Sequence, residues 1–220
     1  MKTLSMSLKD KFTLQNKNTA LMVIDMQNDF CHLSGYNSYK LGLSLKLINK
    51  AKKKIIQLVE WSRYNKLQII FTKESHREDL VDLTNSKRER YKNANTPIGD
   101  KGPMGRFLIR GYEGCELISE IKPFDKDLIL DKTEHSCFVN TNLQNYLKEK
   151  NINNLIICGV TTQCCVLSTY RHSLDLGMDS LLIEDCCGAY DTKIHQSAIN
   201  IINSEDGVLG KTLTLRELIN

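Results

Sequence analysis

The stretch NLIICGVTTQCCV, residues 154–166, joins a short apolar run to a turn and two adjacent cysteines. A compact apolar run such as NLIICG is typical of a strand that is buried on both faces of a parallel sheet. The Gly-Val-Thr-Thr turn leads into a predicted helix over 164–176, which Gly177 ends. Strand, turn and helix indicate a βα unit that places Cys164 and Cys165 at the start of its helix.

The same alternation recurs along the chain. Besides 154–159, strands are predicted at 20–25, 67–72, 127–131, 179–185 and 211–215, and helices at 43–65, 140–150, 164–176 and 191–204. This order predicts an α/β fold: a three-layer, doubly wound, Rossmann-like domain with a mostly parallel six-stranded sheet.

Length and composition indicate one globular domain. The chain has 220 residues, of which 41% are hydrophobic and 25% charged, and no apolar run reaches the roughly 20 residues that span a bilayer. We therefore expect no membrane partner. Residues 1–18 are polar and lack the apolar core of a secretory signal, so we expect them to form an N-terminal extension of a cytoplasmic protein whose domain covers 19–220.

Charge and cysteine content exclude several classes of partner. The net charge is +4, and the two basic clusters, near residues 50–54 and 87–92, are interpreted as a solvated helix face and a solvated loop. No nucleic-acid motif accompanies them, so no nucleic-acid partner is expected. The eight cysteines form no C-x-x-C pair, and adjacent thiols such as Cys164 and Cys165 do not easily both reach one tetrahedral zinc ion.

The segment from about Lys73 to Gly111 breaks the βα rhythm. It is rich in charge, Asn, Gly and Pro, and it is far longer than the usual connection of about 4 to 6 residues. We interpret it as a lid or binding arm. A partly disordered insertion is the alternative.

Three chemically distinct side chains follow predicted strands. Asp25 ends the first strand, Lys132 follows the strand at 127–131, and the turn after 154–159 delivers the two cysteines. Ligands of open α/β sheets bind at the carboxyl ends of strands, so these groups are expected to converge. An ammonium and a helix N-terminus favour a thiolate, and a carboxylate can accept its proton, which together describe an activated nucleophile.

Three of these segments carry a family resemblance. IDMQNDF (24–30), DKTEHSCF (131–138) and GVTTQCCV (159–166) resemble, in order and interval, the signature segments of the isochorismatase-like cysteine hydrolases. The similarity extends from about Asn18 to the C-terminus. Within the family, segments 99–114, 159–191 and 205–210 are most similar to the branch that contains biuret amidohydrolases.

The resemblance implies a catalytic triad of Asp25, Lys132 and Cys165, with Cys164 as a neighbour. It also implies a cis peptide bond between Val160 and Thr161, and an oxyanion hole formed by the backbone N–H groups of Thr161 and Cys165. The implied reaction cleaves the C–N bond of a small linear amide (biuret, ureido or carbamoyl type) through a thioester and releases ammonia or an amine. It needs no cofactor.

The resemblance further implies which residues bind substrate: Phe30, His135 and Glu205. His135 and Glu205 stand where the biuret branch has Lys and Gln. A neutral imidazole and a carboxylate are expected to favour a substrate that is rich in N–H groups or cationic, and to reject a free carboxylate.

The family also bears on metals and assembly. Nicotinamidases of the superfamily hold a metal with an Asp-x-His and a further His, whereas the corresponding KESHRED (73–79) has only His76, so no metal site is predicted. His76 has two interpretations of about equal weight: it is a solvated loop histidine, or it is a functional residue. The presence of Cys165 argues against isochorismate cleavage. The resemblance suggests a homo-oligomer, a dimer or tetramer.

Other functions remain open at this stage. The chain can be a nicotinamidase-like or other amide hydrolase of the superfamily. The adjacent pairs Cys164–Cys165 and Cys186–Cys187 can instead mark a thiol redox sensor, although that hypothesis leaves Asp25 and Lys132 unexplained. A binding or scaffold protein without turnover is the third possibility, because a fold does not guarantee an activity.

Overall fold

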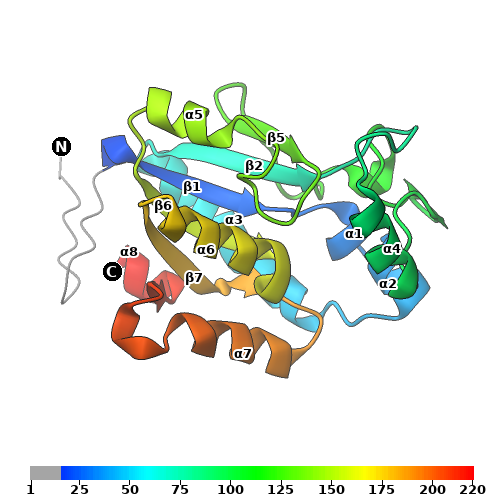
Figure 1. Ribbon diagram of the computed structural model, residues 1–220. Helices are drawn as coiled ribbons and strands as arrows, with labels where there is room; N and C mark the ends of the chain where they lie inside the picture. Colours follow the sequence, from blue (N-terminus) through cyan, green and yellow to red (C-terminus); the bar gives the residue numbers. More distant parts are fainter. Residues whose placement is uncertain (1–15) are drawn as a thin grey trace.

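A six-stranded parallel sheet forms the centre of the protein, whose computed structural model describes residues 16–220 (Figure 1). Its strand order is β5-β2-β1-β6-β7-β8, and every neighbouring pair is parallel. The strands are β1 (Thr19–Ile24), β2 (Gln68–Glu74), β5 (Leu128–Lys132), β6 (Asn154–Val160), β7 (Asp179–Gly188) and β8 (Lys211–Leu213). The predicted doubly wound fold is confirmed, with a sheet that is wholly rather than mostly parallel.

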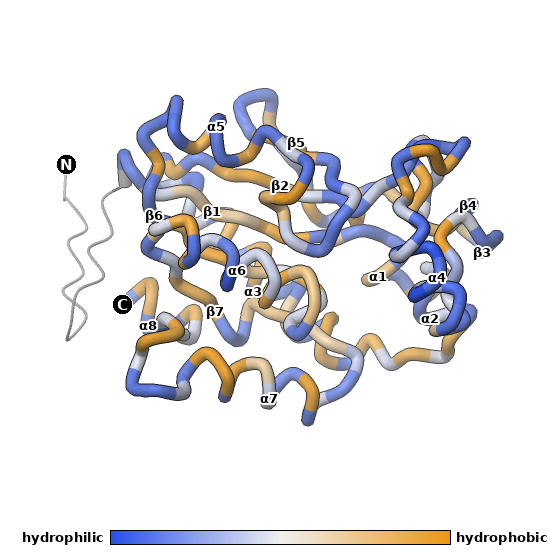
Figure 2. Tube along the Cα trace, in the orientation of Figure 1, coloured by the Kyte–Doolittle hydropathy of each residue, from blue (hydrophilic) through white to orange (hydrophobic). Residues whose placement is uncertain are grey.

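Helices cover both faces of the sheet. Residues of α3 (Lys46–Tyr64) and α8 (Leu215–Ile219) pack on one face, and residues of α5 (Leu143–Glu149), α6 (Leu167–Asp175) and α7 (Thr192–Ile202) pack on the other. Strand β1 is buried along its whole length, and alternate side chains enter the two cores. This two-sided burial explains why its sequence is continuously apolar. Figure 2 shows apolar residues along the central strands and polar residues on the outer ends.

The strand order creates a switch point beside β1. From β1 the chain first builds outward through β2 and β5, and then returns to place β6 on the other side of β1. The helices that follow β1 and β6 lie on opposite faces of the sheet, so the loops after these two strands diverge. Ligands of doubly wound sheets bind in the crevice at this position, outside the carboxyl ends of the strands.

The long segment after β2 is folded. It contains α4 (Asn85–Asn93) and a hairpin of β3 (Lys101–Gly102) and β4 (Gly105–Arg106), and it lies beyond the carboxyl ends of the strands with α1 (Asn28–Cys31) and α2 (Tyr36–Leu41) (Figure 1). A separate small core holds it together, formed by Tyr36, Leu83, Ile98, Phe107, Leu108 and Ile109. The alternative of a partly disordered insertion is therefore wrong.

Short helical turns complete the described chain. They are η1 (Asn16–Asn18), η2 (Glu113–Cys115), η3 (Thr162–Val166) and η4 (Glu205–Gly207), of which η3 is a π-helical turn that continues directly into α6. Most of the predicted N-terminal extension, residues 1–15, lies outside the described residues. Among residues 16–220, no helix is both long enough and apolar enough to cross a bilayer.

Candidate active site

Asp25 directly follows β1 and is completely buried. The hydroxyl of Thr72, on the neighbouring strand β2, donates to Asp25 Oδ1 at 2.6 Å and accepts from the Asp25 backbone N–H at 3.2 Å. These two hydrogen bonds fix the direction of the carboxylate. Its other oxygen, Oδ2, is left to face the charged group described next.

Lys132 is the last residue of β5, and its side chain is also buried. Its Nζ lies 2.8 Å from Asp25 Oδ2, 3.5 Å from Cys165 Sγ and 3.0 Å from the carbonyl of Glu134. Burial disfavours the ammonium, but its electrostatic interactions with Asp25, Cys165 and Glu74 outweigh that effect and hold the pKa of Lys132 well above its usual range. Lys132 is therefore a fixed cation between the carboxylate and the sulfur.

Cys165 lies in the π-helical turn between β6 and α6, and 4% of its surface is exposed. The peptide bond between Val160 and Thr161, just before this turn, is cis, as the resemblance implies. Single π turns inside helices are frequent at functional sites. The turn brings the Cys165 sulfur to within 4.8 Å of the carboxylates of both Asp25 and Glu74.

Glu74 is a member of the cluster that sequence reasoning missed. It is the last residue of β2 and is buried, and its Oε2 accepts a hydrogen bond from the Cys165 thiol at 3.5 Å. Burial disfavours the carboxylate, but Lys132, His135 and Lys87 outweigh it and hold the pKa of Glu74 well below its usual range. The rule that side chains at the carboxyl ends of parallel strands converge was applied to Asp25 and Lys132, and it applies equally to Glu74. The strand was predicted to end at Thr72, two residues too early.

Lys87 was interpreted as part of a solvated loop, and this is wrong. Its side chain is fully buried, 2.6 Å from Glu74 Oε1, and it also donates to the carbonyl of Thr133. Tyr91, one turn further along α4, donates its hydroxyl to the same Glu74 oxygen at 3.1 Å. The other basic residues near 87–92 are exposed, as expected.

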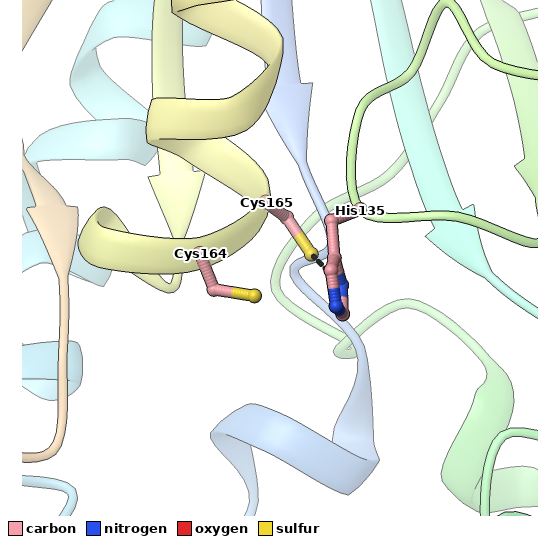
Figure 3. A group of neighbouring side chains, drawn as sticks. All are labelled: His135, Cys164 and Cys165. Atoms are coloured by element: carbon pink, nitrogen blue, oxygen red, sulfur yellow. Dashed lines mark hydrogen bonds between the residues drawn. The ribbon is translucent and has the colours of Figure 1, made fainter. Parts of the chain in front are cut away.

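His135 and the two cysteines form the outer part of the cluster (Figure 3). His135 is half-buried, and its Nδ1 lies 3.9 Å from Cys165 Sγ and 3.8 Å from Glu74 Oε2. Hydrogen bonds with Cys164 and Glu74 raise the pKa of His135 to about 9, so its imidazole is charged at neutral pH. Hydrogen bonding within the thiol pair lowers the pKa of Cys164 to about 5 and, together with burial, raises that of Cys165.

The other two predicted substrate residues belong to different parts of the fold. Phe30 belongs to α1, beyond the carboxyl end of β1, where its ring packs edge-on against Phe107. Glu205 is exposed in the turn between α7 and β8. Because β8 is parallel to β7, the residues that precede it lie at the amino-terminal edge of the sheet, opposite Cys165. The prediction that Glu205 contacts the substrate of this chain is therefore wrong.

The residues at the nicotinamidase metal position do not fit a metal. Glu74, which stands two residues before His76, is engaged by the ammonium of Lys87. His76 is completely buried, which excludes the solvated-loop interpretation, and its Nδ1 lies 3.3 Å from Asp82 Oδ1. Among the residues described, His76 belongs to no cluster of metal-binding groups.

A buried acid, ammonium and thiol at the switch point of a Rossmann-like sheet are the arrangement of a cysteine hydrolase. The profile of the isochorismatase domain matches residues 19–214, and the chain belongs to this family. Ureidoacrylate amidohydrolase RutB of Acinetobacter baylyi is 27% identical, with 90% of this chain and 82% of that protein covered. A probable inactive nicotinamidase of Arabidopsis thaliana is 30% identical, with coverages of 91% and 94%.

Solved structures agree with the fold. A cysteine hydrolase from Pseudomonas syringae pv. phaseolicola superposes with a TM-score of 0.80 at 24% identity, and the match covers 94% of this chain and 93% of that one. N-carbamoylsarcosine amidase from Thermoplasma acidophilum superposes with a TM-score of 0.66 at 24% identity, with coverages of 90% and 95%.

Proposed function

We propose that this protein is an amidohydrolase that cleaves the C–N bond of a small linear amide of the biuret, ureido or carbamoyl type. The observation that carries the proposal is the position of Lys132 Nζ, 2.8 Å from Asp25 Oδ2 and 3.5 Å from Cys165 Sγ. One fixed cation thus adjoins both a proton acceptor and a nucleophile. The names of the relatives, an ureidoacrylate amidohydrolase and a carbamoylsarcosine amidase, support the same bond type.

In the proposed reaction, Cys165 begins as a thiol because its pKa is raised. Its proton passes to the carboxylate of Asp25 as the sulfur attacks the amide carbon, and Lys132 stabilises the sulfur while its charge develops. The backbone N–H groups of Thr161 and Cys165 hold the oxyanion. Asp25 then protonates the departing ammonia or amine, and water hydrolyses the thioester with Asp25 as its base.

The charge of His135 changes the expected substrate preference. The sequence-based hypothesis assumed a neutral imidazole next to Glu205, but His135 has a pKa of about 9 and Glu205 lies at the opposite edge of the sheet. A charged imidazole only donates hydrogen bonds, as a lysine does. We therefore propose that His135 binds a carbonyl or carboxylate oxygen of the substrate, which adds ureido acids to biuret as candidates.

An ammonia-release screen tests the proposal. The purified protein is assayed against biuret, ureido acids, carbamoyl amino acids, maleamate and nicotinamide, with Cys165→Ala as the matched control. We expect release from at least one ureido or carbamoyl amide, and none from the variant. No release from any of these amides, or release that persists in Cys165→Ala, contradicts the proposed function and favours a sensor or scaffold.

A further inference from the structure

The outer part of the cluster gathers three metal-binding side chains. His135 Nδ1 or Nε2, Cys164 Sγ and Cys165 Sγ all lie within 4.8 Å of one another, and Figure 3 shows both sulfur atoms near the imidazole ring. Cys164 and His135 are half-buried, whereas Cys165 is buried. The group therefore lies at the boundary between solvent and the candidate nucleophile.

Local backbone geometry explains how adjacent thiols can share a ligand. In an α-helix successive side chains are separated by about 100°, so neighbouring sulfur atoms point apart. Cys164 and Cys165 instead lie in a π-helical turn, which winds more gradually. In this turn the two sulfur atoms lie within 4.8 Å of one another, so both can reach one ion.

The distances suit tetrahedral coordination. At a tetrahedral angle, zinc bonds of about 2.3 Å to sulfur and about 2.0 Å to nitrogen place a sulfur and a nitrogen ligand about 3.5 Å apart. His135 Nδ1 lies 3.9 Å from Cys165 Sγ, and a nitrogen of His135 and both sulfur atoms lie within 4.8 Å of one another. A small side-chain movement therefore brings two sulfur atoms and one nitrogen around a single ion.

The surrounding charges are also balanced for a divalent cation. Asp25 is paired with Lys132, and Glu74 is paired with Lys87. Lys132 Nζ lies 3.5 Å from Cys165 Sγ and repels a cation that is bound to this sulfur. The carboxylate of Asp25 compensates the charge of Lys132. With both thiols deprotonated and His135 neutral, two negative charges remain, which one divalent ion neutralises.

We propose that His135, Cys164 and Cys165, with water in the fourth position, form a site for a thiophilic divalent cation such as Zn²⁺ or Cd²⁺, which blocks Cys165. Binding forms two metal–sulfur bonds and one metal–nitrogen bond and releases to solvent whichever protons the three ligand atoms carry, without any change in oxidation state. A sulfur that is bound to the ion cannot attack an amide. The cation and the substrate therefore exclude one another.

Cadmium titration of the chelator-treated protein tests the site without any need for turnover. We expect one equivalent of Cd²⁺ per chain to produce a thiolate-to-metal charge-transfer band in the ultraviolet and to slow alkylation of Cys165. Cys164→Ser and His135→Ala should each weaken binding by about tenfold or more, since loss of even an indirect partner of a ligand costs that much.

Two controls match these variants. Cys187→Ala alters the other adjacent pair, whose thiols face opposite cores of the sheet, and His32→Ala removes an exposed histidine. Both should bind Cd²⁺ as the parent does. Absence of the charge-transfer band, or equal affinity in the parent and Cys164→Ser, overturns the proposal. Neither result depends on whether the protein hydrolyses amides, so the two proposals fail separately.

Discussion

Cys164 and Cys165 are neighbours in the chain, but their surroundings differ. Cys164 is half-buried beside His135, whereas Cys165 is buried between Lys132 and Glu74. Of the two, only Cys165 has a contact with the fixed cation of the cluster. The site thus separates an accessible thiol of low pKa from a sheltered thiol that loses its proton only when a base is in place.

The thiol pair gives a prediction about ionisation. Hydrogen bonding with Cys164 is the largest cause of the raised pKa of Cys165, so Cys164→Ala should lower the pKa of Cys165. Lys132→Met should shift it further upward, because Lys132 favours the thiolate. The pH dependence of alkylation, measured for the peptide that contains residue 165, checks both directions. An unchanged midpoint in Lys132→Met would remove Lys132 from the proposed activation of the thiol.

His135 gives a prediction about stability and pH. Its pKa is raised in the folded protein, so its charge stabilises the fold fully below about pH 6.5, the ordinary histidine value. That contribution is lost as pH rises through about 9. His135→Gln should therefore be less stable than the parent at about pH 6, and the difference should shrink toward about pH 10.

Urea unfolding at the two pH values measures this difference. The same substitution at the exposed His32 is the control, and we expect it to show no such trend. A difference between parent and His135→Gln that is constant across the range contradicts a raised pKa for His135.

At the scale of elements, α4 is attached to the sheet by a buried charge rather than by an apolar face. Its sequence, NSKRERYKN, has only Lys87 buried, and that residue reaches Glu74 at the end of β2. Sequence patterns identify helices by apolar periodicity, which α4 lacks. This is why the helix, and the burial of Lys87, could not be predicted from the sequence, although the presence of a functional segment there could.

The buried ion pair that attaches α4 predicts that removing its lysine lowers stability more than removing the lysine of a partly exposed ion pair. Lys87→Met removes the ammonium that lies closest to the buried carboxylate of Glu74 and should cost about 3 kcal/mol or more of unfolding free energy. Lys52→Met is the matched control: its ion pair with Glu120 has the same 2.6 Å distance but is partly exposed, so its loss should cost less than about 1 kcal/mol. Denaturant unfolding of the parent and the two variants measures both losses of unfolding free energy. Equal losses would show that the Lys87–Glu74 pair does not hold α4 on the sheet.

At the scale of the whole molecule, the sheet and the positions of Asp25, Lys132 and Cys165 could be predicted because each depends on a strand and its carboxyl end. The compact apolar runs mark the strands, and parallel order places their ends at one edge. Glu205 was misplaced because motif alignment does not say at which edge a loop lies. Glu74 was missed because β2 continues past its apolar residues. A cytoplasmic location and a homo-oligomer remain predictions.

The most direct test of the proposed hydrolase is to trap its acyl-enzyme. An amide that releases ammonia in the screen is mixed with the protein, quenched in acid and analysed by peptide mass spectrometry. We predict a transient acyl adduct on Cys165, ammonia release that survives in Cys164→Ala, and neither adduct nor release in Cys165→Ala. An adduct on Cys164, or turnover that continues without Cys165, contradicts the assignment of Cys165 as the nucleophile.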